Sequence, residues 1–245
     1  MHKEKIISLS HWIDENTPSF GNKGGFLRKS ISSISKGRNS NSEYWELNNH
    51  IGTHIDFPMH FDDSGKSSSD YEQPFFIFNK IGIVYFDKVV KPNQLINYDL
   101  LSEKLEKLSA DTQIILIKTG FEKFRNSNIY WENNPSFDSN ISTNLKNKFK
   151  NLKIIGFDTI SLTSFNNKDM GKKAHLEFLK VKPPVLIIED MKLSVLEKED
   201  LPLEIHIFPL MIKDSDGSPI NCSLRIKHNI FKDKFSKSSS YIIKD

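Results

Sequence analysis

Imidazole and carboxylate side chains recur at even positions between residues 50 and 60, whereas several odd positions are apolar. The polar set is His50, His54, Asp56 and His60. A period of two is that of a β-strand, so one face of this segment gathers these groups. They are preferred ligands of zinc and similar divalent ions. The pattern predicts a metal site on a buried sheet edge, with the other face packed into a core.

The segment cannot be one straight strand. At ~3.3 Å per residue, His50 and His54 would lie roughly 13 Å apart, too far to share an ion. Gly52 permits a bend between them, and Pro58 turns the chain before His60. A helix is disfavoured by the same glycine and proline. We therefore expect a bent chain that carries His50, His54 and Asp56 around one ion.

The pattern His-x-Gly-Thr-His-x-Asp-x-Pro-x-His resembles the signature of the cyclase-like metal hydrolases, which include bacterial kynurenine formamidase and isatin hydrolase. Further segments resemble this family in the same order: Ile7 to Ser10 with Thr17-Pro18, Leu116 to Gly120, Gly156 to Thr159, and Asp216 to Pro219. The resemblance covers nearly the whole chain. It implies a swivelling β/β/α type of fold and a homo-oligomer, either a dimer or a tetramer.

A catalytic metal keeps an open coordination position and often has a partner ion, so more ligands are expected downstream. His175 lies in a helical stretch, and Glu189 ends the apolar run 184–188. A carboxylate at the mouth of a buried strand is costly unless it is paired or metal-bound. The resemblance implies that His175 and Glu189 are metal ligands. Strand alternation points Asp190 away from the site that Glu189 faces.

The expected chemistry follows from these groups. An ion held by His50, His54 and Asp56 would lower the pKa of bound water towards ~7. Asp56 and Glu189 could bridge to a second ion supported by His175. His60 is suited to be the general acid/base, and the resemblance assigns it this role. Zinc is the expected metal, manganese suits the same ligands, and one or two ions are compatible with this set.

The substrate is less constrained by the sequence. Phe20 follows Thr17-Pro18-Ser19, where the family often has a tryptophan, and suggests an aromatic substrate pocket. The chain departs from the family pattern at residues 21–23 and at Asn221, where an arginine is common. We expect a metal-dependent amidohydrolase, arylformamidase-like, that cleaves the C–N bond of a small aromatic N-formyl or cyclic amide.

Two other classes of protein fit the same residues. One is a cyclase or dehydratase of natural-product biosynthesis, in which the ion polarises a carbonyl without delivering hydroxide. The other is a binding or structural protein with a closed metal site. The presence of His60 argues against a closed metal site, because such a site does not require an additional imidazole beside it.

Composition is consistent with one enzyme domain over residues 1–245. The 34 basic and 31 acidic side chains give a net charge of +3, too balanced to predict a nucleic-acid or membrane partner, so the expected partner is a small-molecule substrate. Cys222 is the lone cysteine, which suits a reducing compartment. The first residues contain no apolar core typical of a signal peptide, so a cytoplasmic location is expected.

Short β-branched runs alternate with amphipathic stretches, which predicts a mixed, β-rich α/β fold. Expected strands are Trp45–Leu47, Phe75–Phe78, Ile81–Phe86, Ile114–Lys118, Ile154–Asp158, Val185–Glu189, Glu204–Leu210 and Asn221–Ile226. Expected helices are Tyr98–Leu108, Ser142–Leu152 and Asp169–Phe178. The serine-rich segments 30–42 and 236–240 are expected to be a loop and a tail.

Overall fold

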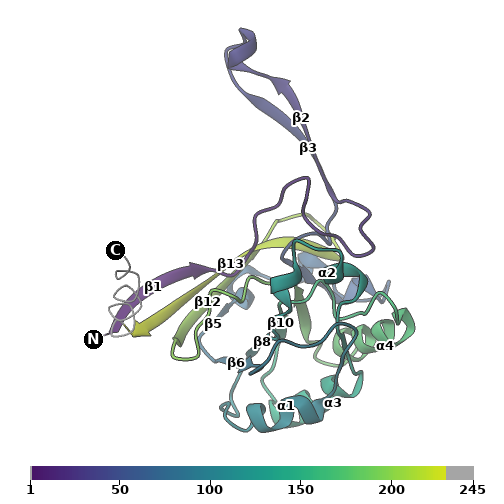
Figure 1. Ribbon diagram of the computed structural model, residues 1–245, viewed down its shortest axis with the longest axis vertical. Helices are drawn as coiled ribbons and strands as arrows, with labels where there is room; N and C mark the ends of the chain where they lie inside the picture. The colour runs from purple at the N-terminus through teal and green to yellow at the C-terminus, as the bar shows by residue number, and fades with distance from the viewer. Residues whose placement is uncertain (1, 230–245) are drawn as a thin grey trace, which may run out of the picture.

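A mixed sheet of nine strands forms the centre of the computed structural model, which describes residues 2–229 (Figure 1). The strand order is β5-β12-β13-β4-β11-β10-β8-β6, and β1 pairs with β13. These strands are β1 (His2–Ser8), β4 (His54–Asp56), β5 (Ile77–Phe78), β6 (Ile81–Tyr85), β8 (Ile114–Lys118), β10 (Ile154–Phe157), β11 (Leu186–Glu189), β12 (Leu201–Pro209) and β13 (Gly217–Asn229).

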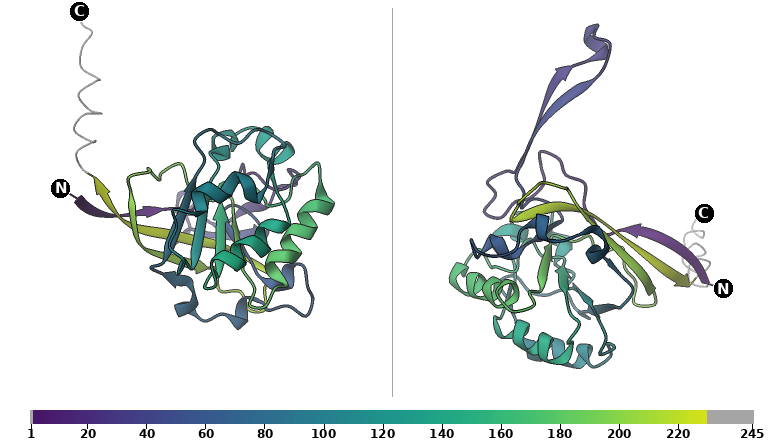
Figure 2. Two further views of the ribbon diagram at one scale, coloured as in Figure 1. Left: turned by 90° about the horizontal axis from the view of Figure 1, so that it is seen from below. Right: turned by 180° about the vertical axis from the view of Figure 1, so that it is seen from behind.

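The helices gather mainly on one side of this sheet (Figures 1 and 2). They are α1 (Tyr98–Leu105), α2 (Ile129–Glu132), α3 (Asn140–Lys148) and α4 (Lys168–Leu179). Single 3-10 turns are η1 (Ile34–Lys36), η2 (Pro58–His60), η3 (Ser68–Asp70), η4 (Gln73–Phe76) and η5 (Phe121–Phe124). Within residues 2–229, no helix is long and apolar enough to cross a membrane.

Alternate residues of the parallel strands divide the core into two layers. On β11, Ile187 packs into the layer that α1, α3 and α4 cover, whereas Leu186 and Ile188 pack into the opposite layer. On β4, Ile55 belongs to the second layer. Because side chains alternate along a strand, His54, Asp56 and Glu189 must face the same side as Ile187. The alternation therefore directs three polar side chains toward α4.

Strand β4 has only three residues and lies between β11 and β13. It is antiparallel to both, with His54 opposite Glu189 and Asp56 opposite Gly217. The expectation of a sheet edge was therefore wrong: the motif lies in the middle of the sheet. The bend at Gly52 is present, because its φ of 62° is a left-handed conformation that favours glycine.

A hairpin of β2 (Phe26–Ser32) and β3 (Ser42–Leu47) projects from the body of the molecule (Figure 1). Its two strands pair only with each other, as do β7 (Leu95–Ile96) and β9 (Ser136–Phe137). Residues 30–42 were expected to be a loop, but β2 continues to Ser32 and the turn contains η1. The segment 236–240 lies outside the described residues.

The strand-dominated α/β class is confirmed, and most expected elements are present. The main differences between the expected and the observed elements concern their lengths and whether a segment is a strand or a 3-10 turn. The segment 75–78 begins as the 3-10 turn η4 and reaches the sheet only at Ile77. Strand β13 is much longer than expected, since it starts at Gly217 beside β4 and continues along β12 and β1.

Candidate metal centre

His54 and Glu189 face each other across the β4–β11 pair, and Asp56 lies beside them on the same face. The Nε2 atom of His54 lies 3.5 Å from Glu189 Oε2 and 3.6 Å from Asp56 Oδ1. One ligand atom from each of the three residues lies within 4.8 Å of the others, and all three side chains are buried. This spacing fits three groups that converge on one cation.

His175 reaches the same cluster from α4. Its Nε2 atom lies 3.3 Å from Glu189 Oε1 and 3.6 Å from Asp56 Oδ2. The Nδ1 atom lies 2.9 Å from the Gly171 carbonyl, one helical turn earlier, and must donate a proton there. His54 is held in the same way, with Nδ1 2.8 Å from the Gly52 carbonyl. Both imidazoles therefore present an unprotonated Nε2 to the cluster when neutral, the form that binds a metal.

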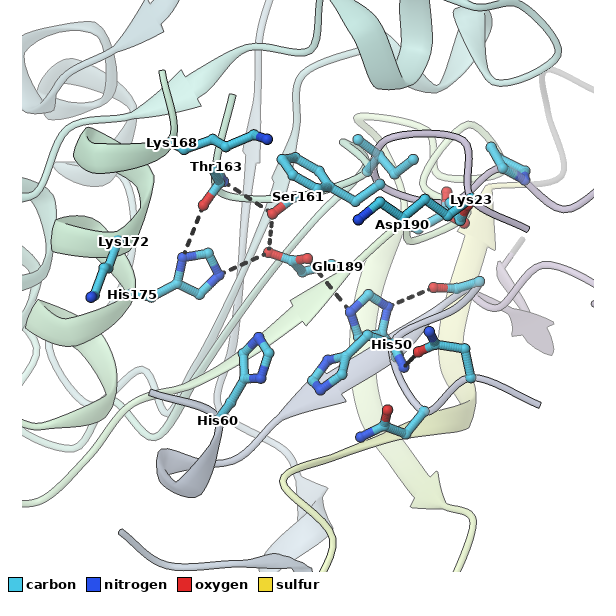
Figure 3. A pocket seen from close by; sticks show the side chains of 18 of the residues that line it. Lys23, His50, His60, Ser161, Thr163, Lys168, Lys172, His175, Glu189 and Asp190 are labelled. Atoms are coloured by element: carbon cyan, nitrogen blue, oxygen red, sulfur yellow. Dashed lines mark hydrogen bonds and ion pairs between the residues drawn. The ribbon is translucent and has the colours of Figure 1, made fainter. Parts of the chain in front are cut away.

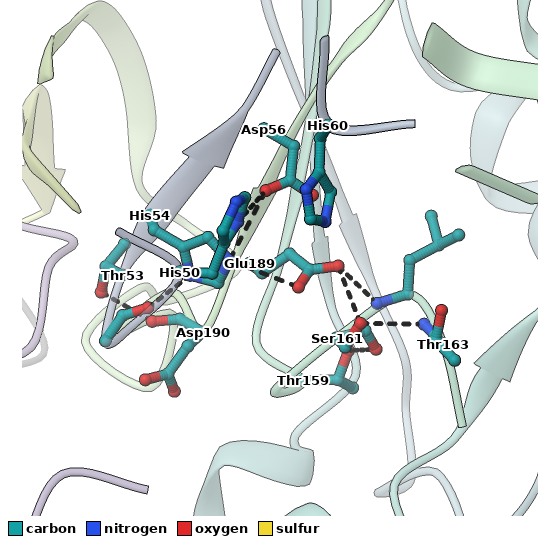
Figure 4. Close-up of polar contacts among 12 residues, drawn as sticks. His50, Thr53, His54, Asp56, His60, Thr159, Ser161, Thr163, Glu189 and Asp190 are labelled. Atoms are coloured by element: carbon teal, nitrogen blue, oxygen red, sulfur yellow. Dashed lines mark hydrogen bonds and ion pairs between the residues drawn. The ribbon is translucent and has the colours of Figure 1, made fainter. Parts of the chain in front are cut away.

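Glu189 is fixed by the loop that follows β10. The backbone amide of Leu162 donates to Glu189 Oε1 at 2.7 Å, and the Ser161 hydroxyl donates to the same atom at 3.1 Å (Figure 4). The other oxygen faces His54 and accepts no hydrogen bond from this loop. The carboxylate orientation is thus set before any ligand binds.

His50 and His60 form a second group beside the first. Their rings stack with centroids 3.9 Å apart. His50 Nδ1 lies 2.9 Å from Asp56 Oδ1, and its Nε2 lies 3.1 Å from Asp216 Oδ2. His60 Nδ1 also contacts Asp216 Oδ2, at 2.9 Å. Ligand atoms of His50, Asp56 and His60 lie within 4.8 Å of one another, so Asp56 belongs to both groups.

Gly217 makes room for the His50 ring. A Cβ atom on Gly217 would lie 2.2 Å from Cε1 of His50 and 2.7 Å from its Nε2 atom. A side chain here would displace the imidazole from Asp56 and Asp216. Asp216, just before β13, and Gly217, its first residue, therefore supply the carboxylate and the space that the second group needs.

The cluster favours positive charge. Burial alone would lower the pKa of His175, but the Asp56 and Glu189 carboxylates beside its Nε2 atom outweigh burial and raise this pKa to about 10. Burial and Asp56 would raise the pKa of Glu189, yet His175 and His54 bring it down to about 2. The carboxylates thus stay ionised, and the positive charge that balances them comes either from protons on the imidazoles or from a cation.

One buried atom indicates that a cation fits. Asp56 is 1% exposed, and its Oδ2 atom has no hydrogen-bond partner among the described residues. A buried, ionised carboxylate oxygen without a partner is costly. His175 Nε2 at 3.6 Å is too distant for a hydrogen bond but suitably placed to share a divalent ion with this oxygen. The donor set of imidazoles and carboxylates fits such an ion.

The cluster forms part of the wall of a cavity of about 540 Å³ (Figure 3). Phe20 and Phe61 contribute apolar surface to it, and Phe61 stacks on His175 with ring centroids 4.5 Å apart. The volume lies in the range of small-molecule sites. An open cavity beside the candidate ligands is the arrangement that a substrate requires.

Asp190 turns away from His175 and enters a different network. Its carboxylate accepts from Arg125 Nη2 at 2.8 Å and from the Tyr130 hydroxyl at 2.6 Å. Asp190 is 1% exposed and has a φ of 50°, which ends the strand geometry of β11. The Thr53 hydroxyl donates to the Asp190 carbonyl at 2.6 Å (Figure 4). These contacts fix the chain on both sides of Glu189 and His54.

All six residues proposed from sequence as ligands or acid/base lie around this cavity, namely His50, His54, Asp56, His60, His175 and Glu189, and Phe20 lines it. Sequence reasoning assigned no role to Asp216, although Asp216 begins one of the segments that resemble the family. An aspartate immediately before Gly-Ser-Pro was the available signal. The contacts of Arg125 and Tyr130 with Asp190 left no signal in the sequence.

The fold and this His–carboxylate centre define a mixed α/β protein with a candidate metal site, and comparisons with known proteins agree. The Cyclase family model matches residues 7–164, so the chain belongs to the Cyclase family. Kynurenine formamidase of Geobacillus thermodenitrificans is 26% identical over 219 residues, which cover 89% of this chain and 96% of that protein.

Solved structures share the fold. Isatin hydrolase A from Labrenzia aggregata, bound to benzyl benzoate, superposes with a TM-score of 0.78 at 17% identity, covering 92% of this chain and 94% of that one. A protein from Bacillus stearothermophilus described as a predicted metal-dependent hydrolase gives a TM-score of 0.70 at 18% identity, covering 91% of this chain and 98% of that one. The strand-dominated α/β architecture is therefore that of cyclase-family proteins.

Proposed function

We propose that this protein is a metal-dependent hydrolase that cleaves the amide C–N bond of a small aromatic N-formyl or cyclic amide. The observation that carries the proposal is the Oδ2 atom of Asp56, which has no hydrogen-bond partner within residues 2–229 and lies among imidazoles beside a cavity lined partly by Phe20 and Phe61. The relatives named kynurenine formamidase and isatin hydrolase support this reaction class.

His54, Asp56, His175 and Glu189 would hold the ion, with His50 on the second group. A divalent ion bound there lowers the pKa of water and polarises a carbonyl. We propose zinc, with manganese suited to the same donors. Two ions are compatible with two groups of donors that share Asp56.

His60 moves the proton in this proposal. Asp216 accepts from His60 Nδ1, so the other ring nitrogen of the neutral imidazole carries a lone pair. That nitrogen takes a proton from the attacking water and returns it to the leaving nitrogen of the substrate. His60 lies on the cavity wall with Phe61, which places the base next to the apolar surface for an aromatic ring.

The test combines metal analysis with a substrate screen. The purified protein is analysed for bound metals and then incubated with formanilide, N-formylkynurenine and isatin, and product masses are measured. A mass gain of one water, or loss of the formyl group, supports hydrolysis. Water loss or ring closure without hydrolysis would support the cyclase alternative, and no reaction with any amide in metal-loaded protein would overturn the proposal.

We also propose that the protein forms a homodimer through the β2–β3 hairpin. Leu27, Ile31 and Trp45 are each more than 60% exposed there, although they are large and apolar. Arg28 and Glu43 already pair within the hairpin at 4.0 Å. Strand β2 also carries Lys29 and β3 carries Glu46, so two hairpins related by a two-fold axis offer these complementary charges to each other.

Light scattering tests the dimer. Trp45→Glu should shift the mass toward that of one chain, whereas Leu201→Glu, which replaces an exposed leucine elsewhere, should leave it unchanged. A wild-type mass of about one chain would refute the dimer. One domain over residues 1–245 and a cytoplasmic location remain predictions of the sequence.

A further inference from the structure

Three lysines line the cavity that contains the candidate metal ligands. Lys168 and Lys172 come from the first turns of α4, and Lys23 comes from the loop before β2. Figure 3 shows Lys23 and Lys168 on different walls, with their side-chain amines directed toward one another. Residues four apart lie on one helix face, so Lys168 and Lys172 form one row along the cavity.

These ammonium groups are not neutralised by the protein. Among the described residues, no carboxylate forms an ion pair with Lys23, Lys168 or Lys172. Lys168 lies over the Phe165 ring at 4.8 Å from its centroid. Lys23 and Lys168 carry like charges that face each other across the cavity, which favours binding of an anion between them, and Lys172 adds positive charge to the same lining.

Two of the three carboxylates that line the cavity, Asp190 and Glu189, are already engaged. Asp190 is paired with Arg125 at 2.8 Å, and Glu189 belongs to the metal centre. Asp169 is the remaining carboxylate on this wall, against three lysines. The lining of the cavity therefore keeps a positive excess, and Phe20 and Phe61 contribute apolar surface to the same cavity.

We infer that the substrate is an anionic aromatic amide, whose carboxylate or similar group is bound by Lys23, Lys168 and Lys172 while its amide lies at the metal centre. This inference rests on the proposed function and narrows its substrate class. The lysines also attract such substrates from solution, and salt screens that attraction.

The experiment compares formanilide with formanilides that carry a carboxylate at the ortho, meta or para position. The measured quantity is the ratio of kcat/KM for the best carboxylate substrate to kcat/KM for formanilide. We expect a ratio well above one for the wild type. Each of Lys23→Met, Lys168→Met and Lys172→Met should lower the ratio about two- to fivefold, since partly exposed charge pairs have modest strength.

Lys173→Met is the matched control, because Lys173 is an exposed lysine on the same helix that does not line the cavity. Its ratio should equal that of the wild type. Raising the salt concentration should lower the wild-type ratio and leave that of the triple Lys→Met variant unchanged. A wild-type ratio near one, or equal ratios in the wild type and the triple variant, would overturn the inference of an anion site. Hydrolysis of formanilide in the same experiment would still support the proposed function.

A binding measurement covers the case in which no amide is hydrolysed. Calorimetry of the metal-loaded protein compares benzoate with benzamide, in the wild type and in the triple variant. Tighter binding of benzoate that is lost in the triple variant supports the anion site, even if the reaction proves to be different. Equal benzoate affinity in the two proteins refutes it.

Discussion

The Thr53 hydroxyl donates a 2.6 Å hydrogen bond to the carbonyl of Asp190. Thr53 precedes His54, and Asp190 follows Glu189, so this bond joins the two strands immediately beside two candidate ligands. The same hydroxyl accepts from the His11 amide at 3.0 Å. One threonine thus fixes three segments around the candidate centre.

Thr53→Val should weaken metal binding roughly tenfold, because contacts that orient ligands typically have this effect. It should also lower the free energy of unfolding by about 1–3 kcal/mol, since two buried hydrogen-bonding groups lose their partner. Competition with a chelator and denaturant unfolding measure the two effects. Thr53→Ser keeps the hydroxyl and should restore most of the metal affinity and most of the free energy of unfolding. If the serine variant lost as much of both quantities as the valine variant, the methyl group of Thr53 would be the important part instead.

His54→Ala and Asp56→Ala should each remove most of the bound metal, because each deletes a buried donor of the cluster. Elemental analysis of the purified variants is the measurement. His206→Ala is the control, since this histidine pairs with Glu204 on β12 and lies outside the cluster. Full metal occupancy in both cluster variants would refute the assignment.

His60→Ala should keep the primary ion and reduce turnover by roughly 10²- to 10⁴-fold, the usual contribution of a general acid/base. Asp216→Asn should reduce turnover less, because it disturbs only the orientation of the His50 and His60 rings. Metal content and kcat are measured on the same preparations. Because His60 also lies in a group of candidate donors with His50 and Asp56, metal loss comparable to that of His54→Ala would make His60 a ligand instead.

Glu189→Gln and Asp190→Asn should affect different properties. Glu189→Gln should lower metal occupancy, since a neutral amide is a poor ligand. Strand alternation alone would make Asp190→Asn nearly silent, but the Arg125 contact changes this expectation. Loss of a buried ion-pair partner should lower the free energy of unfolding by about 3–5 kcal/mol. Metal titration measures the loss of occupancy in Glu189→Gln, and thermal unfolding measures the loss of stability in Asp190→Asn. An Asp190→Asn protein with wild-type stability would contradict the stabilising role of the Arg125–Asp190 ion pair.

Asp158 gives a pH dependence of stability. Burial raises its pKa to about 6, although Thr119 and Gly120 donate hydrogen bonds that favour the charged form. The folded protein therefore binds this proton more tightly than the unfolded chain. The resulting stabilisation is fully present below the unfolded pKa of about 3.9 and is lost as the pH rises through about 6.

The free energy of unfolding of the wild type minus that of Asp158→Asn should accordingly be larger at pH 4.5 than at pH 7.5. The change should be on the order of 1–3 kcal/mol. Denaturant unfolding of the metal-free proteins at the two pH values measures this change. Because the other titrating groups are the same in both proteins, their contributions cancel when the two free energies are subtracted. A difference that does not vary with pH would show that Asp158 has an ordinary pKa.

His50 and His60 lie outside β4 and reach the site through the bend at Gly52 and the turn η2. For His54 and Asp56, period-two spacing was sufficient to predict a shared face, because alternation is a local property of a strand. It could not show that β4 lies between β11 and β13, since pairing partners 130 or more residues away are set by tertiary packing. The same limit explains why Asp216 was missed. Its contacts to His50 and His60 depend on the β13–β4 register rather than on the residues next to it.

The position of β4 also has a consequence for amide hydrogen exchange and for replacement of the metal ion. A three-residue strand that hydrogen-bonds to a neighbour on each side cannot open unless the centre of the sheet separates. Amide protons of β4 should therefore exchange with deuterium only through global unfolding, with or without a bound ion. A centre preformed in this way should release its ion to a chelator without unfolding and accept zinc, manganese or cobalt afterwards in the same folded chain.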